Sequence, residues 1–273
     1  MTNAADTHLP AHLPDLAEIP ESGAQQNYAR LDNRQIRPFR VLAQPAFVLH
    51  SYPYKETSLI VDVFSRQFGR IALLAKGAKR PHSQLRGALQ TFQPLTISWS
   101  GKSDLQTLTA AEWVGGMLPL EKNALLCGFY LNEIIIKLLQ RDDPQPLLFD
   151  EYVATINQLA HAESVPIVLR KFELNLLKMA GVVNDLSFCA RQRGPVSPDS
   201  LYVVDPESGT RPAVESDIAI KVHGRTLIDM QNANYADSTT QAQSKLLMRS
   251  LLAHHLHGNP IHTRQILMDL QKL

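Results

Sequence analysis

Short segments in which apolar and polar residues alternate dominate the chain from about residue 46 to residue 113. They are rich in β-branched and aromatic residues, and their period of two is typical of β-strands. Turn-forming residues separate them, for example Gly69 and the group at residues 101–104. We therefore expect five strands, at residues 46–54, 58–64, 69–76, 92–99 and 105–113.

The spacing of these strands indicates a small barrel. The connection after the third strand, residues 77–91, is much longer than the others. Five short strands within about 70 residues, with one longer connection, fit a five-stranded Greek-key barrel of the OB type. Periodicity allows an SH3-like barrel equally well, and both architectures stay open at this point.

After Pro119 the apolar period changes to the 3.6 residues of an α-helix. The first helical segment is apolar on most faces, which predicts a buried helix. A later one has Ser164 as its cap, Pro166 in its first turn and Gly181 just past its end. We expect helices at residues 121–141, 146–161, 164–180, 239–257 and 263–273.

Two segments lack a sustained period. Residues 1–40 are rich in Pro, Ala, Asn and Gln, which predicts a mobile tail. Residues 182–215 carry four prolines, with a short strand expected at 201–205 before a turn. The predicted fold is α+β and multidomain: a tail (1–40), an OB-fold β-barrel (41–118) and an all-α domain (119–273) with an irregular insert at about 182–215.

Composition narrows the class of protein. Of 273 residues, 44% are hydrophobic, which is enough for a sizeable core. The only two cysteines, Cys127 and Cys189, are too few for a disulfide framework or a four-thiolate zinc site. No segment approaches the roughly 20 apolar residues that span a bilayer. The N-terminus has no secretory pattern, so we expect a cytoplasmic protein without membrane partners.

The formal net charge of +1 hides an uneven distribution. Residues 1–40 carry −1, residues 41–118 carry +4 and residues 119–273 carry −2. No Asp or Glu occurs between positions 66 and 86, and clustered cations without carboxylates are typical of an anion-binding surface. A nucleic-acid backbone is such an anion. The predicted contacts are Arg66, Arg70, Lys76, Lys79, Arg80 and Arg86.

Aromatic residues near these cations suggest base stacking. Phe68 lies in a turn between two arginines, and we expect its ring to be exposed and to bind DNA. Tyr52, Tyr54, Phe64 and Trp99 fit the barrel core better.

Other chemistries find little support. Residues 76–79 lack the spacing of a phosphate-binding nucleotide loop. The histidines at 254, 255 and 257 have no Cys, Asp or Glu close behind them, and position 192, where a zinc motif beginning at Cys189 needs its second cysteine, is Gln. We therefore expect no cofactor, no bound metal and no catalytic residues.

Arg170 and Lys171 lie on a helix with a strongly apolar face. Cations at the rim of such a face suit a peptide with carboxylates and aromatic side chains. From the residues alone, an apolar core face with solvated charges is the stronger interpretation.

Several short motifs follow one another in a characteristic order. In the barrel region they are Ala46-Phe47-Val48-Leu49-His50-Ser51, Glu56-Thr57-Ser58-Leu59, Asp62-Val63-Phe64, Gly69-Arg70, Ala75-Lys76-Gly77-Ala78 and Gly87-Ala88-Leu89-Gln90. In the helical region they are Tyr130-Leu131-Asn132-Glu133, Leu169-Arg170-Lys171-Phe172-Glu173-Leu174 and Thr263-Arg264. Over residues 45–273 the chain resembles the RecO family of bacterial recombination mediators.

The resemblance implies an OB-fold joined to a helical domain and a role in DNA repair. Such proteins bind single- and double-stranded DNA, anneal complementary strands and, with RecR, load RecA onto strands coated by single-stranded-DNA-binding protein (SSB). They dock on the acidic C-terminal tail of SSB, which implies that Arg170 and Lys171 meet carboxylates. Many members hold zinc with four cysteines in the insert. Only Cys189 remains here, so we expect a degenerate zinc-finger-like region without metal.

The resemblance also implies a location in the cell. A member of this family would be cytoplasmic and associated with the nucleoid. Two alternatives stay open: an OB-fold module that binds RNA or tRNA, and a hydrolase with its site in the insert.

Overall fold

The structure, a computed structural model, describes residues 39–161, 163–263 and 265–266. The predicted N-terminal tail, except for residues 39 and 40, and most of the predicted last helix lie outside these residues. Among the described residues, no helix is both long and apolar enough to cross a membrane.

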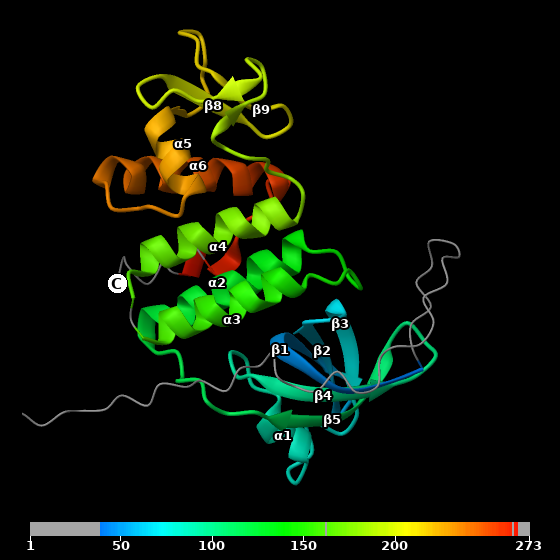
Figure 1. The fold of residues 1–273 in the computed structure, drawn as a ribbon. Helices are drawn as coiled ribbons and strands as arrows, with labels where there is room; N and C mark the ends of the chain where they lie inside the picture. Colours follow the sequence, from blue (N-terminus) through cyan, green and yellow to red (C-terminus); the bar gives the residue numbers. More distant parts are fainter. Residues whose placement is uncertain (1–38, 162, 264, 267–273) are drawn as a thin grey trace, which may run out of the picture.

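Five strands close into a barrel at the bottom of Figure 1. They are β1 (Arg40–Tyr54), β2 (Ser58–Ser65), β3 (Gly69–Ala75), β4 (Leu95–Ser100) and β5 (Gln106–Trp113). The order is β1-β2-β3-β5-β4, and β4 pairs back with β1. Only β3 and β5 run parallel, with Leu73 opposite Gln106, and a short helix α1 (Gln84–Ala88) interrupts the β3–β4 connection. This order is that of an OB-fold, which confirms the predicted fold class over the SH3-like alternative.

Alternation along the strands separates the barrel core from the outer face. Val61 and Val63 of β2, together with Leu73 of β3, are at most 1% exposed and pack around Trp99. β1 begins six residues earlier than the pattern predicts, because a bulge between Val41 and Gln44 hides its alternation.

The helices stack above the barrel in Figure 1. α2 (Lys122–Leu138), α3 (Pro146–Ala160) and α4 (Val165–Met179) lie next to it, followed by α6 (Ser238–His255) and the short α5 (Gly224–Gln231). α4 ends at Met179, and Gly181 follows just past its end with a φ of 72°, which glycine adopts easily. Ser164 occupies the predicted cap position of α4, but its side chain makes no capping hydrogen bond. The sequence pattern did not predict α5.

The insert holds two small sheets between α4 and α5. One pairs β6 (Phe188–Cys189) with β7 (Gly194–Pro195), and the other has the order β10-β8-β9. β8 (Leu201–Asp205) coincides with the predicted strand, followed by β9 (Gly209–Pro212) and β10 (Lys221–His223). The region after the barrel is therefore helical but not purely α. Cys189 is a buried free thiol, and a zinc-finger-like character of this region stays a prediction.

The barrel and the helices share a hydrophobic core. Phe47 and Phe64 point outward from the barrel and meet Phe149 and Tyr152 of α3, with ring centroids 5.2–6.1 Å apart. Burial raises the pKa of the Tyr152 hydroxyl, which donates a hydrogen bond of 2.7 Å to Asn132. Such shared apolar packing holds the two parts in one orientation.

Candidate nucleic-acid interface

The loop that follows β3 carries most of the predicted DNA contacts and is tightly anchored. Ala78 is 1% exposed and packs in the barrel core. The backbone N–H of Lys79 donates a hydrogen bond of 2.8 Å to the carbonyl of Thr57, in the turn between β1 and β2. Farther along, Leu85 and Leu89 pack against the same core. The anchored backbone keeps the loop's polar side chains on the outside.

Four cations of this loop are exposed. Lys76, Lys79, Arg80 and Arg86 all project into solvent, and no salt bridge within the described part of the chain involves any of them. In Figure 1 their loop lies around α1, at the end of the barrel away from the helices. Free cations without carboxylates nearby on the same loop are available to an anion.

A fifth cation comes from a different segment. Lys55 is exposed in the β1–β2 turn, beside Glu56, and its Nζ lies 5.4 Å from the centroid of the Tyr54 ring. The hydrogen bond between Lys79 and Thr57 brings this turn next to the loop. Sequence reasoning missed Lys55 because it lies outside the carboxylate-free run and only the barrel brings it close.

Arg66 and Arg70 occupy a different environment. Arg66 forms a two-pronged ion pair with Asp150 of α3, with N–O distances of 2.8 and 2.9 Å, and this hydrogen bonding raises the pKa of the guanidinium. Arg70 donates to the carbonyls of Ile136 (2.5 Å) and Leu139 (3.2 Å) at the end of α2. These two arginines therefore tie the barrel to the helices in this structure.

Phe68 also differs from its expected exposure. Its ring is half-buried and meets Trp99 edge-on, with centroids 5.0 Å apart and an interplanar angle of 84°. Apolar contact explains this position, because the ring packs against the barrel core. The base-stacking role predicted for Phe68 would have to use the part of the ring that is still exposed.

Arg170, the predicted peptide contact, lies in a buried polar cluster. Its Nη2 donates a hydrogen bond to Oε1 of Glu173. The same oxygen accepts a hydrogen bond of 2.6 Å from the hydroxyl of Tyr130. Glu173 is fully buried, and the Arg170 side chain is 16% exposed. Lys171 is half-buried beside it. Arg170 therefore already has one carboxylate partner, although a guanidinium has five donors in total.

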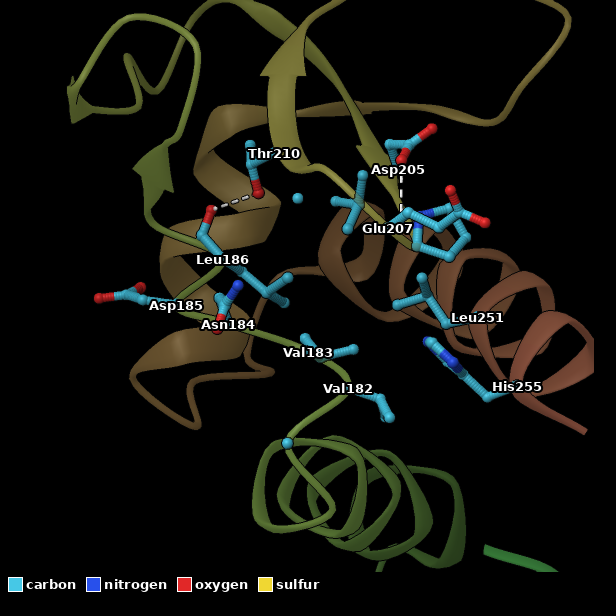
Figure 2. A pocket seen from close by; sticks show the side chains of 14 residues that line it. Val182, Val183, Asn184, Asp185, Leu186, Asp205, Glu207, Thr210, Leu251 and His255 are labelled. Atoms are coloured by element: carbon cyan, nitrogen blue, oxygen red, sulfur yellow. Dashed lines mark hydrogen bonds between the residues drawn. The ribbon is translucent and has the colours of Figure 1, made fainter.

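A cavity of about 210 Å³ lies elsewhere, between the segment after α4, the β8–β9 turn and the end of α6 (Figure 2). His255 borders it, and burial together with the neighbouring histidines 254 and 257 lowers its pKa. The Asp205 carboxylate accepts hydrogen bonds from the backbone of Glu207 (3.0 Å) and Ser208 (2.8 Å). That carboxylate is held within its own turn, which gives the hydrolase alternative no support.

Metal ligands do not gather in the part of the chain that the structure describes: no three His, Cys, Asp or Glu side chains are placed to hold one ion. The histidines at 254 and 255 contact each other edge-on, with centroids 5.1 Å apart.

Comparison with known proteins covers nearly all described residues. A family model described as the N-terminal part of recombination protein O matches residues 40–117, and one described as its C-terminal part matches residues 121–264. The chain is 58% identical over 236 residues to DNA repair protein RecO of Ralstonia nicotianae, with 86% of each chain covered. It is 52% identical over 277 residues to that of Burkholderia pseudomallei, with both chains covered completely. The protein of the same name in Polynucleobacter asymbioticus is 51% identical and covers 86% of this chain and 98% of its own.

Proposed function

Because the chain belongs to the RecO family, with its role in DNA repair and recombination, we propose that it is a DNA-binding recombination mediator. It binds single- and double-stranded DNA, anneals complementary strands and, with RecR, helps load RecA onto DNA coated by SSB. It acts by binding and positioning, without covalent chemistry. These are cytoplasmic events on the nucleoid.

The observation that supports DNA binding is the set of exposed cations around the loop after β3. Lys76, Lys79, Arg80 and Arg86 project from an anchored backbone, and Lys55 adds a fifth charge from the neighbouring turn. Each cation that neutralises a phosphate releases condensed counterions, which drives association at moderate salt. Because Arg66 and Arg70 already bind carboxylates or carbonyls, we assign the phosphate contacts to the exposed cations.

Annealing follows from the same charges. Two complementary strands repel each other, and a cationic surface that binds one of them lowers the repulsion against the second. Contacts to phosphates leave the base edges of the bound strand available for pairing.

The SSB tail is assigned to Arg170 and Lys171 on α4. The buried Glu173 holds the Arg170 guanidinium in place. The remaining N–H groups of the guanidinium can donate hydrogen bonds to a carboxylate of the peptide. Partly exposed apolar side chains of the same helix, such as Leu169, lie beside them.

The experiment compares two charge-removing variants of the full chain. Lys79→Ala/Arg80→Ala removes two cations of the loop, and Lys245→Ala/Arg249→Ala removes two exposed cations of α6 as a matched control. Binding of a labelled single strand is measured at several salt concentrations. The loop variant should flatten the slope of log K against log[salt] by about 1.4, since each lost contact with a single strand counts about 0.7. The control should keep the wild-type slope.

An unchanged slope in the loop variant would contradict the assignment, as would an equal loss in the control. Competition between DNA and RNA oligonucleotides of one sequence tests the RNA-binding alternative in the same assay.

A further inference from the structure

The outer face of strands β1, β2 and β3 is divided into a covered half and an open half. In the covered half, Phe47, Leu49 and Phe64 pack into the core shared with the helices. In the open half, Tyr52 is 43% exposed, and Ile60 and Leu74 are partly exposed. The helices therefore leave only one end of this face accessible to a ligand.

Strand pairing places these three side chains side by side. Tyr52 of β1 lies opposite Ile60 of β2, and Ile60 lies opposite Leu74 of β3. Their neighbours along the strands, Val61 and Leu73, point into the barrel and are at most 1% exposed. Because side chains alternate between faces, Tyr52, Ile60 and Leu74 form one outward row across the sheet. We call this row the apolar platform.

The tyrosine ring packs against the ring of His50 on the same strand. The rings of His50 and Tyr52 have centroids 4.4 Å apart and an interplanar angle of 66°. Both side chains face outward, because His50 pairs with Asp62 two residues before the platform pair. An aromatic ring that is already oriented loses little freedom when a base stacks on it.

Cations border the open end of the platform. Lys55 lies in the turn that joins β1 to β2, Lys76 directly follows β3, and Lys79 is hydrogen-bonded to the same turn. All three are exposed. Apolar ring surface beside several cations is the combination that binds single-stranded nucleic acid.

The opposite end of the platform is closed. Asp62 is 1% exposed beneath Arg70 and Arg141, with an N–O distance of 3.1 Å to Arg141. Gly69 lies so close to the connection between α2 and α3 that a Cβ there would be 1.8 Å from the carbonyl of Asp143. The side of the platform that faces the helices is therefore covered over β2 and β3, and the more open direction for a bound DNA strand is past the β1–β2 turn and the loop after β3.

We propose that the apolar platform binds unpaired bases of single-stranded DNA by stacking on Tyr52, whereas duplex DNA is held by the exposed cations alone. The physical reason is that bases in a duplex are stacked on each other and do not present a free ring face. The inference rests on the proposed DNA-binding function and assigns the two forms of DNA to different parts of the barrel surface.

The test compares Tyr52→Ala, Tyr52→Phe and Trp113→Ala in the full chain. Trp113 is 64% exposed at the end of β5 and serves as a control aromatic residue outside the platform. Affinities for a 20-nucleotide single strand and for the matching duplex are measured at one salt concentration. Tyr52→Ala should weaken single-strand binding by about 5- to 150-fold, the effect of losing one stacked base, and leave duplex binding within about twofold. Tyr52→Phe and Trp113→Ala should bind both forms like the wild type.

An equal effect of Tyr52→Ala on both forms of DNA, or no effect on either, would overturn the inference. A photocrosslink between wild-type protein and a 5-iodouracil single strand provides a second measurement that needs no variant. The crosslink should map to Tyr52, and its absence there would also overturn the inference. If the wild type bound neither form, the proposed function itself would fail. Loss of binding in the loop variant with normal binding in Tyr52→Ala would refute only the platform.

Discussion

The variant Arg70→Ala tests whether this arginine stabilises the fold, as the structure indicates, or contacts DNA, as the sequence predicts. In the structure the Arg70 side chain is 13% exposed, and its guanidinium bridges three groups of the barrel and the helical region. It donates to two carbonyls at the end of α2 and lies 3.6 Å from the buried carboxylate of Asp62. Removing it takes the Arg70 hydrogen bonds from both carbonyls and leaves Arg141 as the remaining ion-pair partner of Asp62 among the described residues.

The size of the effect follows from these contacts. A hydrogen bond with a charged partner contributes about 1.5–3 kcal/mol, and breaking a buried ion pair costs about 3–5 kcal/mol. Arg141 still reaches Asp62 at 3.1 Å, and water can enter the space left behind, so the two contributions do not add fully. We expect the free energy of unfolding to fall by about 3 kcal/mol. At about 2–4 °C per kcal/mol, Tm should fall by about 6–12 °C.

The assay pairs Arg70→Ala with Arg86→Ala, another arginine of the same predicted cluster. Thermal unfolding is followed by circular dichroism, and single-strand binding is measured below both transitions across several salt concentrations. Arg70→Ala should lower Tm and keep the salt slope. Arg86→Ala, at an exposed position, should keep Tm and flatten the slope by about 0.7. The reverse result, a normal Tm with a flattened slope in Arg70→Ala, would refute the structural role.

Two further predictions concern the helical domain. Burial raises the pKa of Glu133, but hydrogen bonds from Lys137, Thr263 and the backbone of residue 262 outweigh it and hold the pKa at about 2, below the ordinary 4.5. The stability that the Glu133 carboxylate contributes is therefore complete above about pH 5 and is lost as the pH falls toward 2. The Tm difference between wild type and Glu133→Gln should shrink over that range. Arg170→Ala removes the ion-pair partner of the buried Glu173 and should lower the free energy of unfolding by about 3–5 kcal/mol in a urea titration. A Tm difference for Glu133→Gln that is independent of pH, or wild-type stability of Arg170→Ala, would contradict these predictions.

Much of the fold was accessible from local sequence pattern. The five barrel strands and the main helices were predicted because apolar periodicity and turn residues act over a few positions. The errors have local causes too: the start of β1 is disguised by a bulge, and α5 is too short to show a period.

The sequence by itself determined that a carboxylate-free basic segment lies on the barrel, since charge and composition are properties of the chain. Only the tertiary structure decided which of those cations are free. Arg66 meets Asp150 across 84 positions of sequence, and Arg70 meets the end of α2 across 66, whereas Lys55 joins the exposed group through a turn. Tyr52, assigned to the core by its pattern, is exposed because the helices cover only half of the sheet face. Side-chain partners are set by packing between distant segments, and local periodicity carries no information about that packing.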